Sequence, residues 1–170
     1  GSKIMNLDSL YKLYVKELKD LYSAEQQLLD ALPKMEQAAK DKDLKAAFAS
    51  HLAETKTQVQ RLEKIFEGLD YAPGGHKCDA MEGLIKEADE LIKADIDPNV
   101  IDAALVAAAQ RVEHYEMAGY GTARAFAEKL GEKTAADLLQ ETLNEEGQAN
   151  QKLTRLAERS LNFVAMTASA

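Results

Sequence analysis

Residues 106–121 read VAAAQRVEHYEMAGYG. Small and apolar side chains recur in this stretch every three or four positions, which is the spacing of one face of an α-helix. Glu113 and Glu116 lie three residues apart beside Val112 and Tyr120, so both carboxylates project toward one side of the helix. Because a buried charge without a partner is costly, two carboxylates on an apolar face indicate a site with a specific role.

The same periodicity continues along most of the 170-residue chain and predicts an all-α protein. Glycine and proline cluster between the periodic segments, as expected of chain reversals between long helices. A shorter amphipathic segment lies in the longest connection. We expect long helices at about residues 7–39, 43–68, 100–130 and 134–160, and a crossover helix at about residues 79–94.

Several residues predict where these helices end or begin. Pro33 removes a backbone hydrogen bond and should kink or end the first helix. Gly131 should stop the third long helix, and Thr134 with Asp137 three residues later approximates a capping box for the fourth. We expect the tail after Ser160 to fray.

Length and charge limit the architecture and the classes of partner. A chain of this length forms one domain by default. Two helical hairpins joined by a connection of about 30 residues give the topology of a four-helix bundle with one long crossover, as in ferritin-like folds. The formal net charge of −8 disfavours binding to nucleic acid or anionic lipid. Residues 1–10, GSKIMNLDSL, contain no apolar stretch before a cleavage site, so we expect a cytoplasmic location.

Each of the other long helices also carries an acidic residue within its apolar stripe. Glu25 has this place in the first helix, Glu54 in the second and Glu146, with Glu145 as a close competitor, in the fourth. Carboxylates from four helices at mid-height of a bundle can hold two hard cations through oxygen ligands. The predicted metal ligands are therefore Glu25, Glu54, Glu113, Glu116 and Glu146.

The residues also permit other interpretations of these glutamates. Glutamate is a strong helix former, so any one of them could be out of phase with the core. The carboxylates could also form a metal-free network with Tyr22, Gln58 and Arg61. His51 lies one turn before Glu54 and could act as a nitrogen ligand or as a hydrogen-bond donor behind a ligand.

Motifs along nearly the whole chain resemble one family. They are Tyr22-Ser-Ala-Glu25, His51-Leu-Ala-Glu54, residues 110–116 (QRVEHYE) and residues 141–146 (ETLNEE). These residues resemble the YciE/YciF-type proteins, a bacterial group within the ferritin-like superfamily that is associated with stress responses. The resemblance implies a ferritin-like bundle with a di-iron centre similar to that of rubrerythrins.

The resemblance to rubrerythrins is incomplete at the histidines. Their centre includes two Glu-x-x-His motifs, but Thr57 follows Glu54 and Ala149 follows Glu146 at the histidine positions. Neither motif therefore supplies an imidazole in this chain.

Three functions are compatible with these observations. The leading hypothesis is a stress-associated protein with a di-iron or other divalent metal pair, iron or manganese, that oxidises ferrous iron with oxygen or peroxide. The second is a non-enzymatic helical stress protein that acts by dimerisation or partner binding. Mineral storage is the third, and it requires a multi-subunit shell. We expect a homodimer, we assign no catalytic residue, and the sequence leaves enzymatic activity open.

Overall fold

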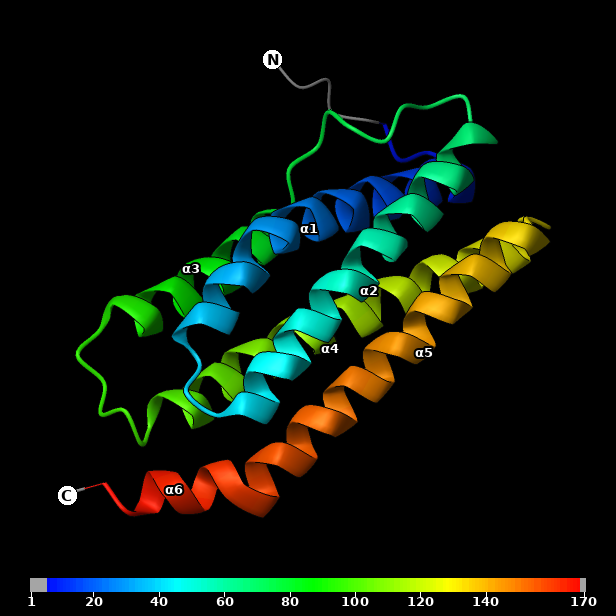
Figure 1. The fold of residues 1–170 in the computed structure, drawn as a ribbon. Coiled ribbons are helices and arrows are strands. Elements are labelled where there is room, and N and C mark those ends of the chain that lie inside the picture. Colours follow the sequence, from blue (N-terminus) through cyan, green and yellow to red (C-terminus); the bar gives the residue numbers. More distant parts are fainter. Residues whose placement is uncertain (1–5, 169–170) are drawn as a thin grey trace.

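A computed structural model describes residues 6–168, which form an antiparallel four-helix bundle with a shorter helix on its side (Figure 1). No strand occurs within this range. The bundle helices are α1 (Leu10–Ala38), α2 (Lys42–Glu67), α4 (Ile101–Lys129) and α5 (Lys133–Leu156), and the crossover contains α3 (Asp79–Lys93). A π-helical turn, Ala157–Leu161, and a short helix, α6 (Asn162–Met166), continue α5.

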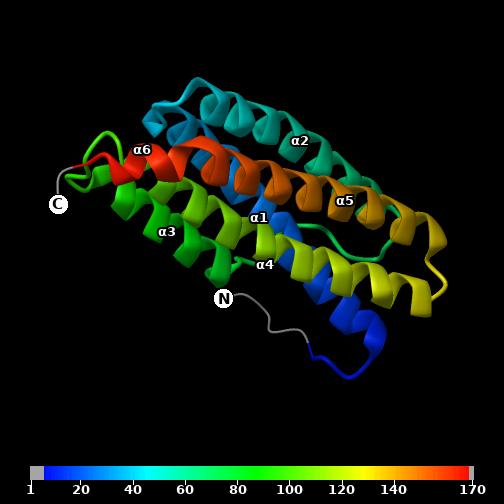
Figure 2. The same ribbon diagram turned by 90° about the horizontal axis from the view of Figure 1, so that it is seen from below.

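The helices are arranged as two hairpins. Short turns join α1 to α2 and α4 to α5, and α1 packs against α4 while α2 packs against α5 (Figure 2). The crossover places α3 against α1 and α4. This arrangement confirms the prediction of an all-α bundle with a helix in its long connection. Among residues 6–168 no helix is long and apolar enough to cross a membrane.

Helix α1 runs through Pro33 to Ala38, close to the predicted end at about residue 39, so of the two outcomes predicted for Pro33 the end of the helix does not occur. Beyond Pro33, buried Met35 packs into the core. Two other predictions about helix ends need correction. The capping box at Thr134 is wrong: α5 begins at Lys133 without a side-chain cap, and the preceding turn is made by Gly131, whose φ of +76° suits a residue without Cβ. The chain also stays helical beyond Ser160 to Met166.

The core consists of two apolar clusters with a polar layer between them. In α1, Leu21 belongs to one cluster and Leu28 to the other, and Glu25 lies between these two leucines. The same succession occurs in the other bundle helices. The buried polar layer comprises Glu25, His51, Thr55, Gln58, Glu113, Glu116, Thr142 and Glu146.

Buried Asp102 fixes the first hairpin to the second. One carboxylate oxygen of Asp102 accepts a hydrogen bond from the backbone N–H of Lys40, and the other accepts one from Asp41, both at 2.8 Å. These donors belong to the turn between α1 and α2, and Asp102 lies in the first turn of α4. The contact therefore fixes the start of α2 relative to α4.

The crossover loop is fastened by a second set of contacts. Cys78 caps α3, and its backbone N–H donates to the Ser23 hydroxyl at 2.9 Å. The Cys78 thiol lies 3.1 Å from the Tyr115 hydroxyl, which donates to Asp20. His76 lies 3.0 Å from the other oxygen of Asp20. Burial raises the pKa of the Cys78 thiol, so this residue acts as a structural contact.

Candidate metal centre

Four of the five predicted glutamates meet in the polar layer. Glu25 comes from α1, Glu113 and Glu116 from adjacent turns of α4, and Glu146 from α5. The solvent-exposed fraction of each is 0%. Each of these glutamates interrupts the apolar row of its helix near the middle, so the assembled helices place all four at one level of the bundle.

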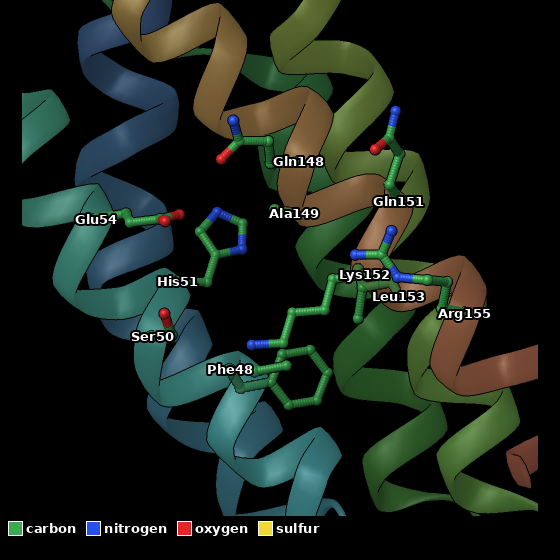
Figure 3. A pocket seen from close by; sticks show the side chains of 11 residues that line it. Phe48, Ser50, His51, Glu54, Gln148, Ala149, Gln151, Lys152, Leu153 and Arg155 are labelled. Carbon is green, nitrogen blue, oxygen red and sulfur yellow. The ribbon is translucent and has the colours of Figure 1, made fainter. Parts of the chain in front are cut away.

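Helix α2 presents a different residue from the one expected. Its buried polar side chains are His51, Thr55 and Gln58, whereas Glu54 is only half-buried and lines a pocket beside His51 (Figure 3). Successive residues of a helix are rotated by about 100°. On an ideal helix the Cα–Cβ direction of Glu54 is therefore about 60° from that of His51, and that of Gln58 is about 20° from it. The longer Glu54 side chain still extends toward the His51 imidazole at the pocket (Figure 3). The inner row of α2 contains a histidine at the level where the sequence suggested a glutamate.

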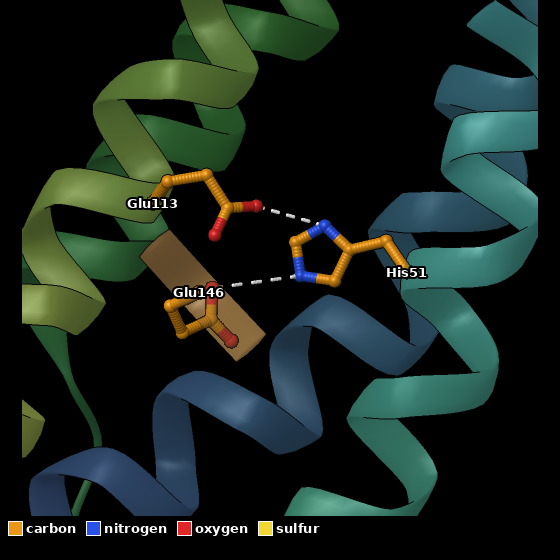
Figure 4. Close-up of side chains that lie close together, drawn as sticks. All are labelled: His51, Glu113 and Glu146. Carbon is orange, nitrogen blue, oxygen red and sulfur yellow. Dashed lines mark ion pairs between the residues drawn. The ribbon is translucent and has the colours of Figure 1, made fainter. Parts of the chain in front are cut away.

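His51 lies between two of the buried glutamates (Figure 4). Its Nδ1 is 2.8 Å from Oε1 of Glu113, and its Nε2 is 3.8 Å from Oε2 of Glu146. The shorter contact is an ion pair when the imidazole is protonated. The imidazole thus supplies a nitrogen at the carboxylate cluster from one turn before Glu54.

The buried side chains form two overlapping groups of three. His51, Glu113 and Glu146 make the first group, and Glu25, Glu116 and Glu146 make the second. Within each group, one potential ligand atom from each residue lies within 4.8 Å of the other two. Such separations fit donors around a single ion, because metal–ligand bonds to nitrogen and oxygen are roughly 2.0 to 2.6 Å long. Glu146 belongs to both groups and could bridge two ions.

The four buried glutamates lie against one another, and His51 Nδ1 approaches Oε1 of Glu113 to 2.8 Å. When the four glutamates are ionised, none of their eight oxygens accepts a hydrogen bond within residues 6–168, and Nε2 of His51 is also without a hydrogen-bond partner. The Gln58 side-chain oxygen and the Tyr120 hydroxyl are also buried without a hydrogen-bond partner. Buried polar groups in folded proteins are almost always paired, so this concentration of buried polar atoms without hydrogen-bond partners is the strongest sign of a ligand.

Burial and mutual proximity make these carboxyl groups weak acids in the metal-free protein. Burial raises the pKa of Glu25 to about 8 and that of Glu113 to about 7. Burial, followed by the charges of Glu146 and Glu25, raises the pKa of Glu116 well above the usual range. Burial, followed by a hydrogen bond with Glu113 and the charge of that residue, does the same to the pKa of Glu146. A divalent cation favours the ionised form and would displace these protons.

The residues that could have neutralised the cluster have other partners. The Arg61 guanidinium donates to both carboxylate oxygens of Glu145, at 2.5 and 3.1 Å. The Gln58 amide donates to Glu145 at 3.2 Å, and the Tyr22 hydroxyl donates to Glu63. The metal-free network suggested by the sequence is therefore not formed by these side chains. Glu145 belongs to an ion pair between α2 and α5 instead of the cluster.

The donor set fits two divalent cations. Four carboxylates carry four negative charges when ionised, and two divalent ions would neutralise them. The first group offers a nitrogen and two carboxylates, as iron and manganese centres do, and the second offers oxygen ligands that suit manganese, magnesium or calcium. The residues present are therefore able to hold a metal pair.

The sequence signal for His51 was its place among the buried polar positions of α2.

Comparison with known proteins identifies relatives over nearly the whole chain. It is 46% identical over 159 residues to protein YciF of Escherichia coli (strain K12), covering 93% of this chain and 96% of that protein. The crystal structure of the E. coli stress protein YciF superposes with a TM-score of 0.88 over 91% of this chain and 98% of that one. YcfI from Rhodopseudomonas palustris gives a TM-score of 0.85 at 46% identity over 89% of this chain and 97% of that one.

A more distant structure supports the fold alone. It is a two-domain protein from Anabaena variabilis with DJ-1/ThiJ/PfpI-like and ferritin-like domains, 16% identical, which superposes with a TM-score of 0.62 over 96% of this chain and 41% of that one. The family model described as "Domain of unknown function (DUF892)" matches residues 9–165. Because this match covers most of the chain, the chain belongs to the DUF892 family.

Proposed function

We propose that this protein is a stress-associated ferritin-like protein that binds a pair of divalent metal ions, iron or manganese, in its polar layer. The observation that carries the proposal is the set of eight buried carboxylate oxygens without hydrogen-bond partners among residues 6–168. Its relative YciF is described as a stress protein. When bound, the metal pair would supply redox chemistry toward oxygen or peroxide, with ferrous iron as the reductant.

The chain contributes ligands with distinct roles. His51 provides a nitrogen at one position, while the other position has carboxylates only. Glu146 belongs to both groups, so its carboxylate could serve as a ligand at either position. Because one position contains nitrogen and the other does not, we expect the two to differ in affinity and to fill in sequence.

Apolar side chains close this layer at both ends along the bundle, while His51 also lines the pocket between α2 and α5. An apolar cluster lies on each side of the layer, with Leu21 and Tyr120 in one cluster and Leu28 and Val112 in the other. A low-dielectric surrounding strengthens the attraction between the carboxylates and a cation. It would also limit access to small reactants such as oxygen, peroxide and single ions.

The test compares iron uptake and oxidation in the full chain and two variants. Chelator-treated protein is loaded anaerobically with ferrous iron, and ferric absorbance is followed after air is admitted. Wild type should bind two irons per chain and oxidise them faster than buffer does, whereas Glu116→Gln, which lacks a ligand of the second group only, should bind at most one iron and lose the rapid oxidation. Glu128→Gln, an exposed position on the same helix, should behave as wild type. Equal uptake and oxidation in wild type and Glu116→Gln would refute the proposal.

A second candidate function, partner binding without catalysis, is favoured by the apolar surface of α6. Phe163, Val164 and Met166 are exposed to 65%, 42% and 82%. Such a surface would be covered in a complex.

We expect a cytoplasmic homodimer. A chain ending at Leu161 should then have half the solution mass of the full chain, while an equal mass for both would exclude α6 from the interface. Tyr14, near the start of α1, is buried in the core and is not available to such an interface.

A further inference from the structure

A pocket of about 380 Å³ opens between α2 and α5 beside the candidate metal centre (Figure 3). This volume lies near the low end of the range for small-molecule sites, roughly 300 to 1,000 Å³. His51 lines the pocket, but the four buried glutamates do not. Both ring nitrogens of His51 approach Glu113 and Glu146. The imidazole therefore lies between the pocket and the acidic layer.

The charge of the pocket is opposite to the charge of the molecule. Lys152 and Arg155 lie three residues apart on α5, and both line the pocket. In the described part of the chain neither of them forms an ion pair, although the protein contains 29 acidic residues against 21 basic ones. Glu54 contributes one negative charge against these two positive ones. The pocket thus offers a positive site on an acidic protein, which favours an anion.

The remaining lining residues fit a small organic molecule. Ser50, Gln148 and Gln151 lie at the solvent-exposed rim of the pocket, and Phe48 and Leu153, which are almost fully buried, form its apolar floor. Polar groups around an apolar floor are typical of a small-molecule site. An occupant with one anionic group and a short apolar part matches this lining.

We propose that the pocket between α2 and α5 binds a small organic anion. Lys152 and Arg155 hold its carboxylate or phosphate group by charge-assisted hydrogen bonds, and Phe48 and Leu153 contact its apolar part. The occupant lies against the face of His51 that is turned away from the glutamates. If the proposed metal centre forms, the bound anion lies next to His51, the nitrogen ligand of that centre. Only this last statement rests on the proposed function.

The test titrates the chelator-treated full chain with butyrate and with butyl phosphate, which share an apolar part and differ in the anionic group, by calorimetry at low ionic strength. At least one of them should bind, and n-butanol should not. Lys152→Gln and Arg155→Gln should each weaken binding about tenfold, which corresponds to ~1.4 kcal/mol. Lys133→Gln, an exposed position on the same helix outside the pocket, should leave the affinity unchanged. Amide NMR shifts should concentrate in residues 47–54 and 148–155.

Three results would overturn the inference. They are no binding of either anion, equal affinities in wild type and in the Lys152 and Arg155 variants, or equal weakening in Lys133→Gln. The Glu116→Gln variant separates this inference from the metal centre. It should bind the anion like wild type even though it is expected to bind less metal. Binding that requires added metal and disappears in Glu116→Gln would make the anion a metal ligand and contradict the pocket.

Discussion

Replacement of Glu25 by glutamine should stabilise the metal-free protein at neutral pH. Glu25 is fully buried, and its pKa is raised from 4.5 to about 8. Between these two pKa values the folded protein keeps the Glu25 proton and the unfolded chain releases it. The contribution of this carboxyl group to the free energy of unfolding is therefore complete below pH 4.5 and is lost as the pH rises to about 8. At pH 7, which is about 2.5 units above the pKa of the unfolded chain, the carboxyl of the folded protein is still protonated. This difference corresponds to about 3 kcal/mol.

The assay is urea unfolding of chelator-treated wild type and Glu25→Gln at pH 5 and pH 7. The variant should exceed wild type by about 3 kcal/mol at pH 7 and by less than about 1 kcal/mol at pH 5. Glu67→Gln, an exposed position on α2, should match wild type at both values. Saturating ferrous or manganous ion should narrow or reverse the difference between wild type and Glu25→Gln, because wild type can bind an ion at both ligand groups whereas the variant has lost a ligand of the second group. Equal stabilities of wild type and Glu25→Gln at pH 7 would refute the reasoning.

Three further predictions follow from individual contacts. His51→Ala should reduce the number of divalent ions bound per chain from two to one by elemental analysis, because it removes the only nitrogen from the two ligand groups of the described chain; two ions in the variant would exclude His51 as a ligand. Asp102→Asn replaces an oxygen that accepts a backbone N–H with an amide that cannot, and should lower the free energy of unfolding by ~1–3 kcal/mol; an unchanged urea midpoint would contradict this. Gly119→Ala would place a Cβ 2.7 Å from Cδ2 of buried Leu21 and should cost ~1–3 kcal/mol through overpacking; an unchanged or higher Tm would show that the helices accommodate it.

Most of the fold followed from helical periodicity, because each long helix has an apolar row that is interrupted only near its middle. Local signals were less reliable at the ends of α5. Its start is determined by the positive φ of Gly131 and by the Glu132 N–H, which donates to the Ala127 carbonyl at 2.8 Å. The Thr134 hydroxyl has no part in that cap. Beyond α5 the chain remains helical because Leu161 packs into the core, a contact that depends on the assembled bundle.

The candidate site was partly visible in the sequence. Glu25 and Glu146 stand within otherwise apolar rows, so their burial could be predicted. On α2 three polar residues interrupt the same face, and an apolar stripe about 100° wide does not distinguish His51 from Glu54 by spacing alone. The lack of hydrogen-bond partners for the carboxylates could not be predicted, because it depends on Arg61 pairing with Glu145.

The most direct test of the central claim is the number of divalent ions bound per chain. Untagged, chelator-treated protein is dialysed anaerobically against ferrous or manganous ion and analysed for metal, with Glu146→Gln and Glu128→Gln in parallel. Because Glu146 belongs to both ligand groups, we expect two ions per chain in wild type and in Glu128→Gln, and at most one, bound weakly, in Glu146→Gln. A wild type that takes up no metal, or a Glu146→Gln variant that binds two ions as tightly as wild type, would contradict a shared carboxylate metal centre.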